Sequence, residues 1–152
     1  INAGIAGDHL LSMIARADRD VVRYQPDLVL INGVLNWGLN LGTTAQYREH
    51  LRGLVRRLRQ ETEADIVLLT PNGDLPNPAY PQAPEGERTV DRVQAVRQLA
   101  QEEQACLADA YAVWERVREE GCPWEELLCN GFNHPSVEGQ LVYAITLMKL
   151  CQ

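Results

Sequence analysis

The residues of this chain that could do chemistry are one histidine near the C-terminal end and two small polar blocks before it. His134 stands directly before Pro135, at the predicted start of a helix. A histidine so placed can act as a general base that takes a proton from a hydroxyl nucleophile and later returns it to a leaving group. Gly7 follows Asn2 within a short glycine-rich segment, and Asn36 lies in the loop after an apolar run. Backbone and side-chain amides of this kind are the donors that stabilise an oxyanion.

Neither serine of the chain has the setting of a catalytic nucleophile. Ser12 falls inside a predicted helix and Ser136 at the start of another, whereas an activated serine stands on a turn at the end of a strand. Cys129 is only a few residues from His134, and residues so close in sequence rarely reach the geometry of a nucleophile and its base. The chain therefore offers a histidine and amide groups that could do chemistry, but no hydroxyl or thiol in the setting of a nucleophile.

Short apolar runs predict the strands that would hold these blocks. Residues 28–31, 66–69 and 106–108 are continuously apolar, and a further strand is expected to end at Asn2. Because strands of this kind alternate with helices, they indicate a parallel sheet that is covered on both faces. In such sheets functional residues gather at the carboxyl ends of the strands. All three polar blocks follow predicted strands.

Amphipathic patterns predict the helices between and after these strands. They are expected over about residues 8–25, from Thr43 or Thr44 through Leu58, from Thr89 through Ala100, through 111–117, and from Pro135 through Met148. The apolar residues of the last helix share one face: Val137, Leu141, Ala144, Ile145 and Met148. Prolines between Pro71 and Pro84 predict a loop over 71–88.

The composition is ordinary for a globular protein, with 45% hydrophobic and 23% charged residues. A net charge of −7 argues against a nucleic-acid surface, which needs a basic patch. The arginines between Arg48 and Arg59 follow the polar side of a predicted helix and indicate a solvated face. No apolar stretch approaches the ~18 residues of a membrane span. The cysteines lack metal-ligand spacing, and Cys122 and Cys129 form either a disulfide or two buried free thiols.

Three segments of the chain together resemble a known family. The segments Asn2–Asp8, 28–31 with the following Asn36, and Asn130–Pro135 are similar to three of the four blocks of the SGNH (GDSL-like) hydrolases. The resemblance implies a flavodoxin-like three-layer α/β/α fold with a parallel sheet, in a single domain of residues 1–152. In that family the block with the nucleophile, Gly-Asp-Ser, precedes the glycine block. We therefore expect the domain to be N-terminally incomplete, with the first strand, the first helix and the serine on a further segment.

The resemblance also implies roles for individual residues. Gly7 and Asn36 match the family's oxyanion donors, and His134 matches its general base. The glycine and the aspartate that usually flank the family asparagine are absent here. A rival register that aligns Gly33 with the family glycine would put Leu35 in the donor position and abolish the side-chain donor.

An asparagine stands nearest to the place where the family has its triad aspartate. Asn130 can orient the imidazole of His134 by accepting from its N–H, but it cannot stabilise the charge of the imidazolium. Three interpretations remain open: a weak orienting role for Asn130, a Ser–His dyad, or an inactive site.

The resemblance implies hydrolysis of a small ester, such as an acetylated carbohydrate, an acyl lipid or a thioester, with no cofactor and no metal. Asn2, Trp37 and Asn133 are expected to contact the substrate, and Trp124 would help to shape a cleft. One alternative is a non-catalytic binding module that keeps the fold and the cleft. A flavodoxin-like nucleotide-binding domain is a weaker alternative, because the short turn Gly4–Gly7 is the one candidate for a phosphate loop.

Overall fold

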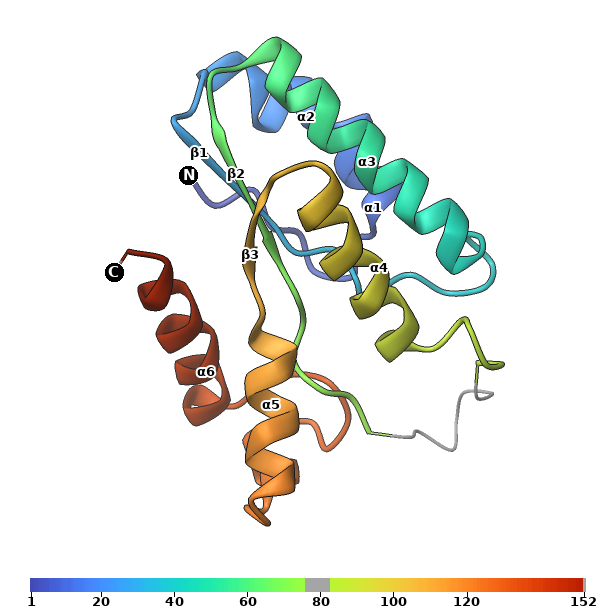
Figure 1. Cartoon of the computed structure of the whole chain (residues 1–152), viewed down its shortest axis with the longest axis vertical. Coiled ribbons are helices and arrows are strands. Elements are labelled where there is room, and N and C mark those ends of the chain that lie inside the picture. The colour runs from blue at the N-terminus through green and yellow to red at the C-terminus, as the bar shows by residue number, and fades with distance from the viewer. Residues whose placement is uncertain (76–82, 152) are drawn as a thin grey trace.

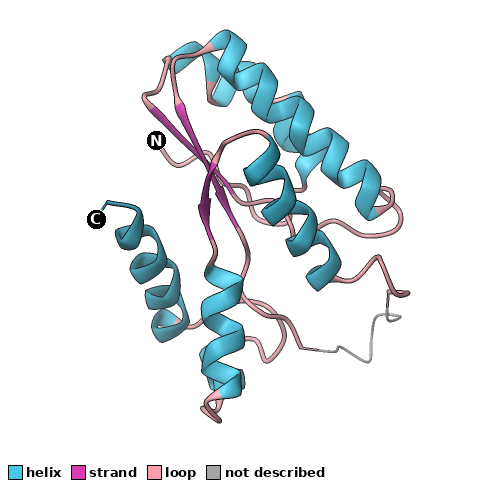
Figure 2. Cartoon of the chain, in the orientation of Figure 1, coloured by secondary structure: helices cyan, strands magenta, loops and turns pink. Residues whose placement is uncertain are grey.

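Three parallel strands form the centre of the protein (Figure 2). A computed structural model describes residues 1–75 and 83–151 of the chain. The strands are β1 (Leu28–Ile31), β2 (Asp65–Leu69) and β3 (Cys106–Ala108), in the spatial order β1-β2-β3. The predicted parallel sheet is therefore confirmed. The expected strand at Asn2 is not formed, because no described strand pairs with the outer edge of β1 and a lone strand leaves its backbone groups without partners.

The helices alternate with the strands along the chain, as the patterns predict (Figure 1). Their bounds are α1 Leu10–Ala15, α2 Ala17–Asp20, η1 Val22–Tyr24, α3 Thr44–Glu61, α4 Thr89–Glu102, α5 Ala110–Glu119, η2 Trp124–Leu127, α6 Val137–Met148 and η3 Lys149–Cys151. The helix predicted over 8–25 is divided into three short pieces, because the backbone at Arg16 and Val21 leaves the helical region. Part of the predicted loop over 71–88, residues 76–82, lies outside the described residues.

Side-chain caps fix where several of these helices begin. Thr43 accepts a hydrogen bond from the backbone N–H of Gln46, and the Gln46 side chain accepts from the backbone N–H of Thr43, which forms a capping box at the start of α3. The Ser136 side chain accepts a single hydrogen bond from the backbone N–H of Gly139 and so caps the start of α6. The cap at Ser136 fixes the end of the segment that contains His134.

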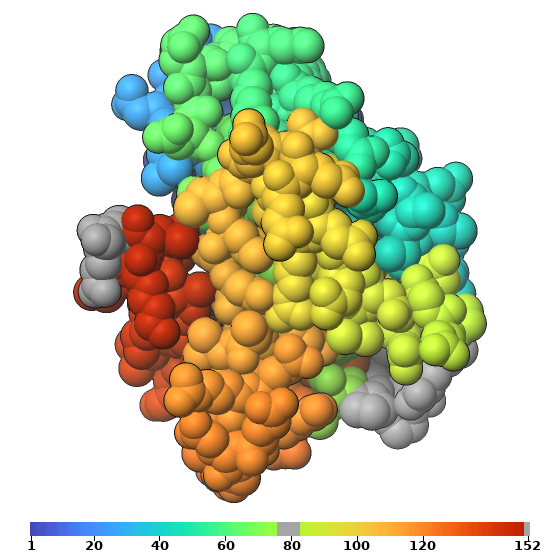
Figure 3. Space-filling view, in the orientation of Figure 1, coloured from blue at the N-terminus to red at the C-terminus, as the bar shows by residue number. Residues whose placement is uncertain are grey.

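One face of the sheet is fully covered. The helices α1 to α4 pack there on the inward side chains of β1 and β2, and Figure 3 shows α3, α4 and α5 forming one continuous outer surface. The largest fully buried side chains of this layer are Leu10, Val34, Trp37, Tyr47, Leu51, Val55, Leu58, Leu68, Val93, Val96 and Leu99. The predicted solvated face of α3 is confirmed in part, because Arg56 and Arg59 are exposed whereas Arg48, Arg52 and Arg57 are half-buried. Several of these arginines pair with Glu102 and Glu103 at the end of α4.

The other face of the sheet is covered only in part. There α6 packs its Tyr143 and Leu147 against Val67 and Leu69 of β2, on the opposite side of the sheet from α3 and α4 (Figure 1). Leu30 points to the same face as its β2 partner Val67, yet it is 42% exposed. This face of β1 therefore has no covering layer among the described residues.

The apolar face that the sequence predicts on α6 is also left uncovered by the described residues. Val137 is 74% exposed and Met148 66% exposed, and Leu141 and Ile145 between them are more than half exposed. The helix buries instead a different side, through Gly139, Val142 and Thr146. An apolar face of this size on a helix usually packs against another element.

The state of the cysteines and the character of the helices bear on two further predictions, a disulfide or buried thiols and the lack of a membrane span. Cys106, Cys122 and Cys129 are free and exposed, so neither the disulfide between Cys122 and Cys129 nor the pair of buried thiols is formed. Within residues 1–75 and 83–151, no helix combines the length and the apolar character needed to cross a bilayer.

Two glycines in helices give a matched test of how closely α6 is packed. A Cβ at Gly139 would lie 2.4 Å from the backbone oxygen of Leu127, whereas a Cβ at Gly53 on α3 would meet nothing within 4 Å. We expect Gly139→Ala to lower the free energy of unfolding by about 1–3 kcal/mol, because backbone must shift. Gly53→Ala should raise it by about 0.5–1 kcal/mol through a less flexible unfolded chain. Urea unfolding of both variants measures the difference, and equal effects would contradict the close approach of α6.

Candidate active site

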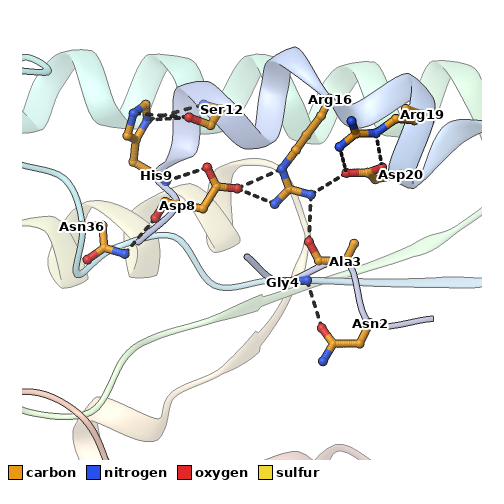
Figure 4. A network of polar contacts seen from close by, with 10 residues as sticks. All are labelled: Asn2, Ala3, Gly4, Asp8, His9, Ser12, Arg16, Arg19, Asp20 and Asn36. Carbon is orange, nitrogen blue, oxygen red and sulfur yellow. Dashed lines mark hydrogen bonds and ion pairs between the residues drawn. The ribbon is translucent and has the colours of Figure 1, made fainter. Parts of the chain in front are cut away.

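The two segments predicted to carry oxyanion donors, Asn2–Asp8 and the loop with Asn36, lie against each other (Figure 4). Asn36, in the loop after β1, donates from its side-chain Nδ2 to the backbone carbonyl oxygen of Asp8 at 2.8 Å. Gly7, which precedes Asp8, has a φ of 73°, a left-handed conformation that favours glycine. A carboxamide carries two N–H donors, and the second one of Asn36 has no acceptor among the described residues. Asn36 is thus held through one N–H, and its second N–H is not used by the described residues.

An arginine anchors the segment that carries Gly7. Arg16 donates to the Asp8 carboxylate at 2.8 Å, to the backbone oxygen of Ala3 at 2.7 Å and to Asp20 at 2.7 Å (Figure 4). Because Ala3 and Asp8 lie on both sides of Gly7, these bonds fix the turn from two directions. The candidate donors are therefore preorganised, which is what stabilisation of an oxyanion requires.

The same arginine makes the turn sensitive to acid. Burial works to raise the pKa of Asp8, but hydrogen bonds from Arg16, Ser12 and the His9 backbone outweigh it and hold the pKa below its usual range. A carboxyl with a lowered folded-state pKa adds stability above the unfolded-state pKa. That stability is lost as the pH falls through the folded-state pKa.

The segment that carries His134 is held by hydrogen bonds to its backbone. The carbonyl oxygen of His134 accepts from the N–H of Cys129 at 2.8 Å, and the carbonyl oxygen of Phe132 accepts from the N–H of Leu75 at 2.9 Å. The carbonyl oxygen of Asn133 accepts from the side chain of Asn72 at 2.9 Å. The imidazole of His134 is exposed. A fixed backbone with an accessible ring suits a general base.

Asn130 shapes this loop and does not touch the imidazole. Its side-chain oxygen accepts from the backbone N–H groups of Phe132, Asn133 and His134 at 2.9–3.0 Å. Its Nδ2 donates to the side-chain oxygen of Asn133 at 3.1 Å. No described hydrogen bond joins Asn130 to the ring of His134, so the predicted acceptance of the ring N–H is not the contact that forms. The carboxamide oxygen is drawn to three converging backbone donors instead.

Trp37 is a core residue, which corrects its prediction as a substrate contact. The side chain is 1% exposed, and its Nε1 donates to the carbonyl oxygen of Gly42 at 2.9 Å. Its ring packs edge-on against Tyr47, with 5.3 Å between the ring centroids. An indole whose N–H has a backbone partner is readily buried whole. Trp124, which was expected to help shape a cleft, is also a buried core residue and packs against Trp114.

The two asparagines that were also expected to contact the substrate have different surroundings. Asn2 is exposed, and its side-chain oxygen accepts from the N–H of Gly4 at 2.9 Å (Figure 4). Asn133 is half-buried, and both its backbone and side-chain oxygens are used to hold the loop. Of the two, Asn2 keeps the more accessible side chain.

The side chains considered as nucleophiles within the chain have structural roles. Ser12 contacts the ring of His9 at 3.2 Å, but its own N–H also donates to that ring, which is the N-cap contact of α1. Ser136 caps α6. Cys129 is exposed. The one described hydrogen bond between Cys129 and His134 joins their backbones and does not involve the thiol.

Two residues of this region were not identified from the sequence. Asn72, 1% exposed, follows β2, and Tyr143 lies on α6. In the sequence Asn72 is one of several turn-forming residues, and Tyr143 belongs to an apolar helix pattern. A buried asparagine is recognised only when its partners are known, and these partners come from segments far apart in the chain.

The parallel sheet, with its polar loops at the carboxyl ends of β1 and β2, defines an α/β protein of the SGNH hydrolase fold. The chain belongs to the GDSL-like lipase/acylhydrolase family, whose sequence profile matches residues 1–142. This confirms the family that the three sequence blocks indicate. Membership identifies the function class as that of an acylhydrolase or esterase.

Solved structures with the same fold include two kinds of protein. An acetylxylan esterase from Geobacillus stearothermophilus is 25% identical, with a TM-score of 0.78, over 98% of this chain and 70% of that one. A GDSL-like lipase-type protein from Parabacteroides merdae is 21% identical, with a TM-score of 0.83, over 97% and 70%. Structures of the esterase include catalytic mutants in which a serine, an aspartate or a histidine is replaced by alanine. A search of curated proteins gave no match.

Proposed function

We propose that this chain carries the oxyanion hole and the general base of a serine esterase whose nucleophile is on a further segment. The observation that carries the proposal is the hydrogen bond from Asn36 to the backbone of Asp8, directly after Gly7. It brings the side chain of Asn36 to the residue that directly follows Gly7, the two positions that the family resemblance pairs, and it favours the register with Asn36 over the one with Leu35.

The reaction follows from these positions. The serine hydroxyl attacks the ester carbonyl while His134 takes its proton, and the oxyanion accepts from the N–H of Gly7 and the Nδ2 of Asn36. Collapse of the tetrahedral intermediate expels the alcohol, which receives the proton from His134. Water then attacks the acyl-enzyme while His134 takes its proton. The second tetrahedral intermediate breaks its bond to the serine oxygen, which receives the proton back from His134, and the acid is released.

The free edge of β1 supports the proposal for the position of the serine. A groove of about 580 Å³ runs along this edge, between the segment Ile1–Gly4 and β1. The outer backbone groups of β1 have no described partner, and its apolar residues Leu28 and Leu30 are exposed. A parallel strand in the groove would pair with β1, and a helix after it would cover the exposed face of β1. Such a strand would end at the same edge of the sheet as Asn36.

Asn130 fits a positioning role in this mechanism. Its side-chain oxygen accepts a hydrogen bond from the backbone N–H of His134, so it acts on the imidazole ring only through the backbone. We therefore propose that the working unit is a Ser–His dyad, in which no carboxylate of this loop stabilises the imidazolium. The alternative function is a non-catalytic binding module. It is favoured by the asparagine, Asn130, that stands where the family has its triad aspartate.

The substrate that we propose is a small acyl ester of a carbohydrate. The acetylxylan esterase of similar fold is the support for this class. The open setting of Asn36 and His134, both exposed, agrees with a substrate that enters from solvent.

Replacing Asn36 tests the proposed oxyanion hole. In the complete protein, Asn36→Leu should lower kcat for an activated acetyl ester by about 10²–10³-fold, because a donor to the developing oxyanion is lost. Asn40→Ala, in the same exposed loop, is the matched control and should leave kcat unchanged. Unchanged turnover in Asn36→Leu would overturn the proposed role of the loop, and no turnover in the wild type would favour the binding module.

A further inference from the structure

A buried polar cluster joins α6 to the loop after β2. The hydroxyl of Tyr143 donates to the side-chain oxygen of Asn72 at 2.7 Å and accepts from the backbone N–H of Asn72 at 2.5 Å. Asn72 is 1% exposed. The two residues therefore make a two-point contact away from water, where each hydrogen bond is costly to lose.

The same asparagine reaches the loop of the proposed general base. Its Nδ2 donates to the backbone oxygen of Asn133, the residue before His134, at 2.9 Å, and to the backbone oxygen of Gly73 at 2.7 Å. Three residues further on, the N–H of Leu75 donates to the backbone oxygen of Phe132. The loop after β2 thus holds the two residues that precede His134.

We propose that Asn72 and Tyr143 are positioning residues that fix the backbone at His134 and so keep its imidazole in reach of the nucleophile. The inference rests on the proposed esterase function, and it adds residues from two elements outside the three family blocks. Tyr143 fixes the orientation of the Asn72 side chain, and Asn72 fixes the position of the backbone carbonyl of Asn133. Neither residue touches the substrate.

The environment of Tyr143 suits this role. Burial raises the pKa of Tyr143 to about 12, against the smaller opposing effects of hydrogen bonds with the Asn72 backbone and the Asn32 side chain. The hydroxyl therefore remains a neutral donor over the working pH range of an esterase. Asn32 follows β1 directly, so Tyr143 also links the His134 loop to the strand that leads to Asn36.

The expected effect is on the rate constant and not on substrate binding. A displacement of a reacting group by about 1 Å from a distant change can cost about 10²-fold in rate. Because neither Asn72 nor Tyr143 contacts the substrate, KM should change by less than about 2-fold.

Two variants and one control separate this role from general stability. Tyr143→Phe removes only the hydroxyl, and Asn72→Asp keeps the acceptor for Tyr143 while it removes the donor to Asn133. Thr146→Val is the control, because Thr146 is a buried residue one turn further along α6 whose hydroxyl bonds within the helix to Val142. In the complete protein, both test variants should lower kcat by about 10–100-fold, and the control should not.

Amide hydrogen exchange gives a second measurement that does not depend on turnover. In Tyr143→Phe the amides of 132–134 should exchange faster than in the wild type, and in Thr146→Val they should not. Faster exchange together with a lower kcat supports the proposal. Unchanged exchange, or an unchanged kcat in an active protein, overturns it. Absence of hydrolysis in the wild type overturns the esterase function, and the catalytic role of Asn72 and Tyr143 with it.

Discussion

In the complete protein, His134→Ala should lower kcat/KM for an activated aryl ester by about 10³-fold or more. The imidazole is the group to which we assign the proton of the nucleophile, so its loss should leave the hydroxyl unactivated. The fold should be unchanged, because the ring is exposed and the hydrogen bonds at this position belong to the backbone. Equal melting temperatures of variant and wild type would verify this point.

His50→Ala is the control for this experiment. His50 is an exposed histidine on α3, beside the ring of Trp37 and outside the proposed site. Its replacement should leave kcat/KM within about 2-fold of the wild type. Near-normal hydrolysis by His134→Ala would remove His134 from the mechanism and favour the binding module.

The strands could be predicted because their burial is recorded directly in the sequence. Residues 28–31 and 66–69 are apolar without interruption, and they form β1 and β2. Only β2 is buried on both faces; in β1 the side chains of Leu28 and Leu30 are exposed. The helix predicted over 8–25 was wrong in its continuity. Its apolar spacing is helical, but Arg16 bonds to Ala3, Asp8 and Asp20 where the helix is broken, and no spacing rule anticipates such contacts.

The site could be predicted in part, for a similar reason. Short motifs marked Gly7, Asn36 and His134, and the structure brings the first two together. The prediction that Trp37 contacts the substrate is wrong. Its place in a loop suggests an accessible side chain, but its N–H donates to the backbone oxygen of Gly42, and the indole is buried. The contacts of Asn130 depend on a loop conformation in which three N–H groups converge. Residue types alone do not specify that conformation.

The nucleophile should be found on a segment outside residues 1–152. Isolated residues 1–152 should therefore give no ester hydrolysis above buffer, a loss of at least about 10³-fold relative to the complete protein. They should also unfold with little cooperativity, because the edge of β1 and the apolar face of α6 are left uncovered. Thermal melting and turnover of the two proteins, side by side, measure both effects. A sharp melt and full activity of residues 1–152 would contradict the proposal.

The most direct test is to find the residue that reacts. The complete protein would be treated with a fluorophosphonate, which modifies activated serines, and the adduct located by peptide mass spectrometry. We expect one adduct on a serine outside residues 1–152, formed much more slowly in His134→Ala and at the normal rate in His50→Ala. An adduct on Ser12 or Ser136, or labelling that does not depend on His134, would contradict it.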